Sequence, residues 1–162
     1  MNQYFFILGN NTNLSLIEIY SVLNGWNYSF ETINETKDYL IIECSTPLNL
    51  EELQAQLGGS IKIGEIILSK KTHEIGNSYQ ELEKYLIKHT IEAKRIFFGY
   101  NLYSYKKKKE LDNLFKWALS FKKQLKELDY GKRRLVQSKE DVLSSVVVKK
   151  NKLLDDIGFD LN

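Results

Sequence analysis

The feature that most constrains the fold is a series of six short apolar segments in the first 70 residues, separated by turn-forming residues. Four segments have the composition and alternation of β-strands, and two have the apolar spacing of amphipathic helices. Their order predicts strand, helix, strand, strand, helix, strand. The predicted strands cover residues 4–8, 28–33, 39–44 and 61–68, and the predicted helices follow Ser15 and Asn49.

Polar residues mark where both helices begin. Ser15 is predicted to be the N-cap of the first helix, with Glu18 three residues later completing a capping box. Asn49 is predicted to cap the second helix, and the glycines at 58 and 59 to end it. The order β-α-β-β-α-β is that of the ferredoxin-like fold, so residues 1–70 are predicted to form one ferredoxin-like domain.

The sequence pattern of the second half predicts a further α/β domain at residues 78–162, after a linker at residues 71–77. Ser78 and Glu81 mark the start of its first helix, residues 95–103 alternate as a strand, and residues 106–128 form a long amphipathic helix. A short strand is expected at 133–137, a helix start at 138–145 and a last strand at 153–162. The abrupt stop at Asn162, without a polar tail, indicates truncation. The predicted fold class is α+β.

Charge is distributed unequally between the two halves. Residues 1–80 contain four basic and nine acidic side chains, whereas residues 81–162 contain 19 basic and 12 acidic ones. The formal net charge of +2 therefore hides an acidic half and a basic half. A basic half of this kind indicates contact with a polyanion.

Few residues of the chain are suited to catalysis or metal binding. One cysteine and two histidines leave no zinc-binding set, and the sequence has neither a dinucleotide-binding glycine motif nor a Walker-type phosphate loop. No apolar run reaches the roughly 18–20 residues of a membrane span, and no signal-peptide pattern is present. A single cysteine suits a reducing compartment. The chain alone is therefore predicted to be non-catalytic, free of metal, outside the membrane and cytoplasmic.

Three basic clusters lie in the second half, at residues 106–109, 132–134 and 149–152. A single lysine run is often only a solvated helix end, but three clusters in one small domain favour a phosphate-binding surface. The cluster at 132–134 contains two arginines at the entrance of a predicted strand, and arginine can bind phosphate in a bidentate manner.

Several segments resemble a family of RNA-modifying enzymes. Residues 4–9 (YFFILG), 14–18 (LSLIE) and 57–63 (LGGSIKI) are similar to the N-terminal ferredoxin-like domain of the tRNA guanine-N2-methyltransferases that carry a THUMP domain. Residues 133–136 (RRLV) and 143–151 (LSSVVVKKN) resemble the THUMP segment of the same proteins. The resemblance spans most of the chain, and its most specific parts are 57–63 and 143–151.

The resemblance implies that the second domain is THUMP-like and binds tRNA at the acceptor end, including the single-stranded 3′ tail. It also implies a methyltransferase domain, in cis or in trans, that uses S-adenosylmethionine and an Asp/Asn-Pro-Pro-Tyr motif. Pro47 is the only proline, so this chain lacks that motif and no cofactor is expected in it. Carried over by position, the RNA-binding candidates are Arg133, Arg134, Ser144, Ser145, Lys149, Lys150 and Asn151, and Lys132 is added on charge alone.

Three other interpretations compete with tRNA capture for a methyltransferase. The chain could be a stand-alone RNA-binding adaptor that recruits a separate enzyme, which a native reading frame ending at Asn162 would favour. It could be a protein-interaction module of tandem ferredoxin-like units, whose tRNA binding would be weak and indifferent to the basic clusters. An independent enzyme would be supported by S-adenosylmethionine binding to this chain alone.

Overall fold

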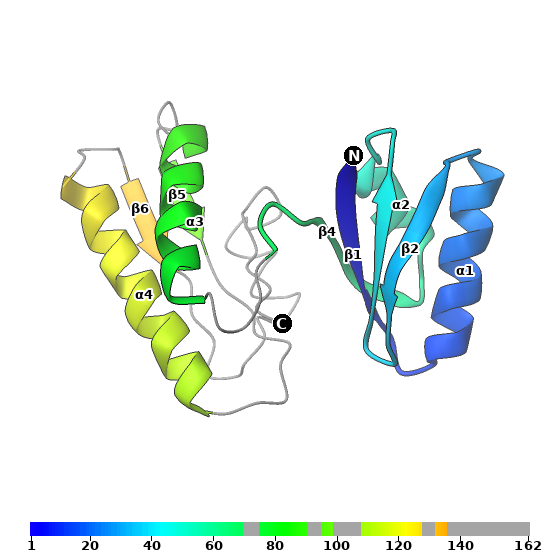
Figure 1. Cartoon of the computed structure of the whole chain (residues 1–162), viewed down its shortest axis with the longest axis horizontal. Coiled ribbons are helices and arrows are strands. Elements are labelled where there is room, and N and C mark those ends of the chain that lie inside the picture. Colours follow the sequence, from blue (N-terminus) through cyan, green and yellow to red (C-terminus); the bar gives the residue numbers. More distant parts are fainter. Residues whose placement is uncertain (70–74, 91–94, 99–107, 128–131, 136–162) are drawn as a thin grey trace. The chain divides into compact units, whose positions relative to one another are not determined.

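The computed structural model of the chain describes residues 1–69, 75–90, 95–98, 108–127 and 132–135 (Figure 1). In the second half, side chains are described for residues 79–88 and 112–127. The chain divides into two compact units, Met1–Ser69 and Lys70–Asn162, called the first and the second unit below. Both units combine helices with strands, in agreement with the predicted α+β class.

The first unit contains the six elements that its apolar segments predict, in the predicted order. The strand bounds differ from the predicted ones by up to three residues, because strand ends depend on pairing with neighbouring strands and not only on local composition. The elements are β1 (Asn2–Leu8), α1 (Thr12–Gly25), β2 (Phe30–Glu35), β3 (Tyr39–Cys44), α2 (Leu50–Gln56) and β4 (Ser60–Glu65).

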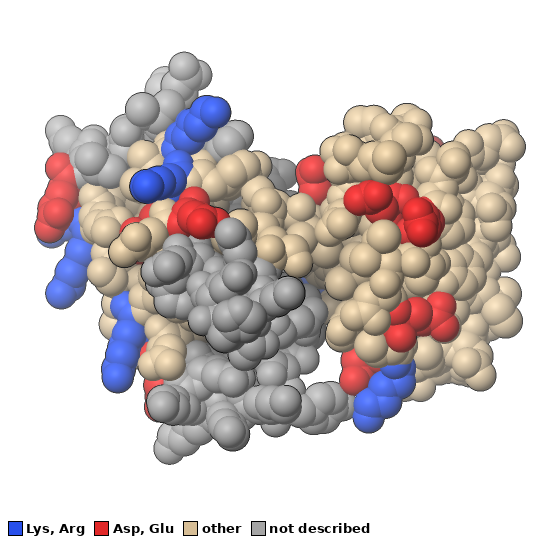
Figure 2. All heavy atoms as spheres, viewed as in Figure 1, with Lys and Arg blue, Asp and Glu red and all other residues tan. Residues whose placement is uncertain are grey.

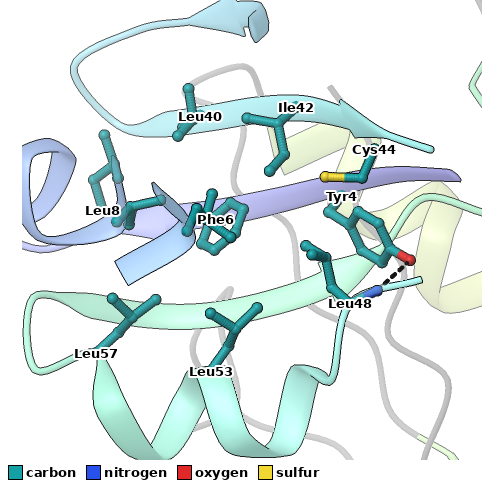
Figure 3. Close-up of a cluster of buried hydrophobic side chains, with 11 residues drawn as sticks. Tyr4, Phe6, Leu8, Leu40, Ile42, Cys44, Leu48, Leu53 and Leu57 are labelled. Atoms are coloured by element: carbon teal, nitrogen blue, oxygen red, sulfur yellow. Dashed lines mark hydrogen bonds between the residues drawn. The ribbon is translucent and has the colours of Figure 1, made fainter. Parts of the chain in front are cut away.

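The four strands of the first unit form one antiparallel sheet with the order β2-β3-β1-β4. β1 is an inner strand, and its Phe6 has Leu40 and Ile63 as register partners. Alternate residues of a strand belong to opposite faces of a sheet. The face that carries Phe6 is covered by both helices, because Ile19 of α1 and Leu53 of α2 belong to the same buried cluster as Phe6 (Figure 3).

Tyr4 connects this core to the loop before α2. Its ring is buried, and its hydroxyl accepts a hydrogen bond from the Leu48 backbone N–H at 3.1 Å (Figure 3). The tyrosine thus fills apolar space while its polar atom keeps a partner, as buried tyrosines generally do. The predicted cap of α2 follows directly and is confirmed, since the Asn49 side chain accepts a hydrogen bond from the Glu52 N–H at 3.3 Å.

The start of α1 differs from the prediction. The helix begins at Thr12, and Asn11 is its N-cap, with the Asn11 side chain accepting a hydrogen bond from the Leu14 N–H at 3.3 Å. Ser15 therefore lies inside the helix, where it is buried. The capping box predicted for Ser15 and Glu18 was wrong, because both side chains have partners elsewhere in the fold.

Ser15 and Glu18 bind the segment between α2 and β4. The Glu18 carboxylate accepts hydrogen bonds from the backbone N–H groups of Gly58, at 2.9 Å, and Gly59, at 2.7 Å. The Ser15 hydroxyl donates to the Gly59 carbonyl at 2.7 Å, and the Gly9 N–H donates to the same carbonyl at 2.8 Å. One junction therefore joins α1, the end of β1 and the start of β4.

The second unit contains a parallel βαβ arrangement among its described residues. β5 and β6 pair in parallel and α4 connects them. The long helix predicted at 106–128 is observed as α4, whereas α3 begins three residues before the predicted cap Ser78, so residues 75–77 are helical and not linker. Residues 99–103 and 136–162, for which further elements were predicted, lie outside the described residues. The elements are α3 (Ile75–Thr90), β5 (Arg95–Phe98), α4 (Lys108–Glu127) and β6 (Lys132–Leu135).

Aromatic side chains hold α3 and α4 together. The Trp117 ring stacks on Tyr79 and Phe121, with ring centroids 5.2 Å and 5.5 Å away. The Trp117 Nε1–H donates to the Glu83 carboxylate at 2.8 Å, so the buried indole also has its hydrogen bond. Because α4 contacts β6 as well, its buried side is set by α3 and β6 together. Among the described helices, none combines the length and the apolarity needed to cross a bilayer.

Cys44, the only cysteine of the chain, offers a direct test of the core of the first unit. Its side chain is buried in the same cluster as Phe6, and this burial raises the pKa of the thiol. Disulfide reagents react with the exposed thiolate, so both effects protect Cys44 in the folded unit. We expect native protein to react with a chromogenic disulfide roughly 100-fold more slowly than denatured protein, since about 3 kcal/mol of stability suffices for that ratio. Equal rates would contradict the buried position of Cys44.

Candidate nucleic-acid interface

Three of the eight predicted RNA-binding residues lie in the described part of the chain. Lys132, Arg133 and Arg134 are the first three residues of β6, whose backbone pairs in parallel with β5. The structure therefore places the basic cluster at 132–134 on a strand, at its N-terminal end. The other five predicted residues lie outside the described residues; they are Ser144, Ser145, Lys149, Lys150 and Asn151.

The strand position distinguishes the three basic residues of β6 from one another. Successive residues of a strand alternate between its two faces. Lys132 and Arg134 therefore belong to one face of β6, and Arg133 belongs to the other. The register also pairs Lys132 with Arg95 of β5, a basic residue that the sequence analysis did not select. The backbone thus brings together Arg95 and Lys132, which lie 37 positions apart in the sequence.

α4 has one buried side and one strongly basic side. Trp117 and Phe121 lie on the buried side, together with aliphatic residues. A turn of 3.6 residues places residues 116, 123 and 126 on the exposed side. Figure 2 shows lysine side chains on the surface of the two helices of this unit. The exposed lysines of α4, called the α4 lysine face below, are Lys116, Lys122, Lys123 and Lys126.

The charge of the α4 lysine face is only partly compensated. Asp112 and Glu127 are the exposed acids on the part of α4 whose side chains are described, and no ion pair joins the four lysines to another described residue. Lysines in the last turn of a helix also stabilise its dipole, which accounts for Lys126 without any ligand. Lys116 lies about three turns before the end of α4, so the dipole does not account for it.

The end of α4 and the start of β6 lie at the same end of the βαβ arrangement. α4 ends at Glu127 and β6 begins at Lys132, and a chain of this length spans at most about 18 Å. Arg95 is at the same strand end as Lys132. The C-terminal end of α4 and the starts of β5 and β6 therefore belong to the same end of this unit.

The α4 lysine face was not predicted, because its lysines do not form a run of three or more basic residues. Lys116, Lys123 and Lys126 are separated by seven and by three positions, a spacing that places them on one side of a helix. The apolar periodicity of the same segment carried the necessary signal. A search for basic residues opposite the apolar stripe would have found them.

The first unit has no comparable basic surface. Residues 1–69 contain two lysines, Lys37 and Lys62, and eight acidic residues, and most of the charged side chains visible on this unit in Figure 2 are acidic. Two adjacent backbone N–H groups, those of Gly58 and Gly59, have the arrangement of an anion site. They are occupied by the Glu18 carboxylate, so they serve the fold and do not offer a phosphate site.

Metal binding finds no support in the described residues, where no group of three His, Cys, Asp or Glu side chains could hold an ion. Comparison of the chain with protein-family models gives no match, and comparison with curated proteins gives no significant match. Basic charge in the described part of the second unit is concentrated on the α4 lysine face and at the start of β6.

Proposed function

We propose that this chain captures tRNA through its second unit and positions it for an S-adenosylmethionine-dependent methyltransferase domain, in cis or in trans. The observation that carries the proposal is the α4 lysine face, an exposed row of positive charge on a helix whose other side is firmly packed. The resemblance of residues 57–63 and 143–151 supplies the choice of tRNA and of methylation. The single cysteine favours the cytoplasm as the place of action.

The proposal assigns a ferredoxin-like domain to the first unit and a THUMP-like domain to the second. The first assignment is supported by the element order β-α-β-β-α-β and by the antiparallel strand order β2-β3-β1-β4. The second assignment rests on the resemblance of residues 133–136 and 143–151. With its acidic surface, the first unit would repel RNA phosphates, so its proposed role is to orient the second unit.

Phosphate contacts suit the task of presenting a large folded RNA to an enzyme. They fix the orientation of the RNA without reading its bases. Lysine is a mobile point charge on a long stem, and a row of lysines on a rigid helix can follow a backbone without demanding one geometry. Base choice would then be left to the methyltransferase domain.

Replacing the four lysines of the α4 lysine face with glutamine should weaken tRNA binding by at least about tenfold, because up to four phosphate contacts are lost. The logarithmic salt dependence of the affinity should become shallower by about one unit for each contact removed. Fluorescence anisotropy with labelled tRNA at several salt concentrations measures both quantities.

Lys84 and Lys88 provide the matched control, because both are exposed lysines on the neighbouring helix α3. The double variant K84Q/K88Q should change the affinity less than K116Q/K123Q, which removes the same charge from α4. Circular dichroism should be the same for all variants, since glutamine and lysine have similar helix propensities. Identical affinities of the two double variants would show that only net charge matters and would remove the α4 lysine face from the interface.

A second candidate function, protein interaction, is favoured by the outer side of α1. Leu14 and Ile17 are 60% and 63% exposed and lie one turn apart. Glu18 is the only charged residue of α1, and its carboxylate is engaged by Gly58 and Gly59. This side of the helix is therefore apolar and almost uncharged, which is typical of protein contacts. Weak tRNA binding that is indifferent to the α4 lysines would favour this candidate.

A further inference from the structure

The register of β5 and β6 assigns each position of the two strands to one of two faces. Register partners on neighbouring strands belong to the same face, and successive residues of one strand alternate between the faces. Arg95 and Lys132 are register partners at the start of the two strands, and Arg134 lies two positions further along β6. These three basic residues therefore share one face, called the cationic face below. Phe97, the register partner of Arg134, belongs to the same face.

The opposite face of the two strands is mostly apolar. Its members are Ile96 and Phe98 from β5, and Arg133 and Leu135 from β6. The helix α4 contacts β6, and the buried side of α4 consists of aromatic and aliphatic residues. The mostly apolar face of the strands is therefore the one suited to packing against α4. Arg133 belongs to this face, so it is separated from its two basic neighbours in the sequence.

The cationic face brings three positive charges close together. Neighbouring strands lie about 4.8 Å apart and a strand rises about 3.3 Å per residue, so the three backbone positions lie within about 8 Å of one another. Arg95 and Lys132 place like charges at paired positions, an arrangement that destabilises a sheet. A bound anion relieves this repulsion, because each cation then faces a negative charge.

We infer that Arg95 is a further RNA-binding residue, and that Arg95 and Lys132 hold one backbone phosphate between them. Arginine offers a planar fork of donors that binds phosphate in a bidentate manner, and lysine adds a mobile point charge. Arg134 adds a contact on the same face, whereas Arg133 takes no part. The inference rests on the proposed function and specifies which residues of the strands serve it.

The test measures the affinity of the full chain for labelled tRNA by fluorescence anisotropy. R95Q should weaken binding roughly tenfold, which corresponds to the lower end of the range for one charged hydrogen bond. R95K keeps the charge and should retain more of the affinity than R95Q. K84Q, which removes one positive charge from α3, is the control for net charge and should have a smaller effect than R95Q.

Arg133 and Arg134 provide a comparison of the two faces within one strand. R133Q and R134Q remove the same charge from adjacent positions of β6, but from opposite faces. R134Q should weaken tRNA binding several-fold more than R133Q. Circular dichroism should be the same for all variants. If R95Q alters the fold, the comparison of R133Q with R134Q still decides which face binds RNA.

A double-mutant cycle tests whether Arg95 and Lys132 share a phosphate. If they do, R95Q/K132Q should weaken binding by less than the product of the two single fold-changes, because the first substitution already disrupts the contact of the second residue. A double variant whose loss equals that product would show that the two residues act separately. That result would overturn the shared phosphate.

The outcomes separate this inference from the proposed function. In a chain that binds tRNA, an effect of R95Q no larger than that of K84Q would overturn the inference and leave RNA capture in place. Equal effects of R133Q and R134Q would do the same, because the choice of face would then be wrong. A wild-type chain that does not bind tRNA would overturn the proposed function, and the inference with it.

Discussion

Replacing Gly59 with alanine should destabilise the first unit by about 3 kcal/mol, the combined effect of overpacking and of weakened hydrogen bonds to a charged group. A Cβ atom at this position would lie 2.9 Å from the Ser15 hydroxyl oxygen, 3.0 Å from a Glu18 carboxylate oxygen and 3.1 Å from the Ser15 Cα. The Ser15 Cα belongs to the helix backbone and cannot rotate away. The substitution therefore separates α1 from the start of β4 and weakens the hydrogen bonds that Gly59 makes with both side chains.

Gly25 is the matched control for this substitution. It ends α1, its φ is not positive, and a Cβ atom there would meet no atom within 4 Å. Gly25→Ala should be neutral or stabilise the unit by up to about 1 kcal/mol, since alanine lowers the entropy of the unfolded chain. Denaturant titrations followed by Cys44 reactivity report on the first unit in both variants, because Cys44 lies in its core. Equal stability of the two variants would contradict the tight junction.

Replacing Phe6 with alanine should reduce the free energy of unfolding of the first unit by about 3–5 kcal/mol. Phe6 is completely buried on an inner strand and belongs to the cluster that both helices cover. A unit of this size has roughly 3–10 kcal/mol of total stability, so the variant should be largely unfolded at modest denaturant concentrations. The Cys44 thiol should then react almost as fast as in denatured protein, a result that can be read even if the variant does not fold.

Phe5, the neighbour of Phe6 on β1, is the matched control for the Phe6 substitution. It is half-buried, lies on the opposite face of β1, and its ring covers Gly64 of β4, where a Cβ atom would come within 2.4 Å of the ring. Phe5→Ala should destabilise the unit by only about 1–2 kcal/mol, because part of the ring already contacts water. A larger effect for Phe5 than for Phe6 would show that the face of β1 covered by the helices has been assigned wrongly.

The order of elements in the first unit could be predicted because its signals are local. Strand alternation and helix periodicity are properties of short segments, and β1, β3 and α2 were expected close to where they are observed. The N-cap of α1 was misplaced because Asn11 and Ser15 both belong to the residue types that cap helices. Contacts with Gly58 and Gly59, more than 40 positions away from Ser15, decide between them.

The candidate interface was only partly predictable for a similar reason. The basic cluster at 132–134 can be recognised in the sequence as three consecutive basic residues. That these residues alternate between the two faces of a strand follows only from their position in β6. The long helix was predicted from its apolar spacing, but the contacts of its buried side were not: Trp117 stacks on Tyr79 of α3 and on Phe121.

By itself, the sequence of this protein determined the α+β class, the order of six elements in the first unit and the location of basic charge in the second half. Each of these follows from the composition and spacing of neighbouring residues. Only the tertiary structure decided that Ser15 and Glu18 hold Gly58 and Gly59 instead of capping α1, and that Trp117 of α4 packs on Tyr79 and hydrogen-bonds to Glu83 of α3. Both outcomes depend on which distant segments bury which face, and the free energy of that burial exceeds any local preference.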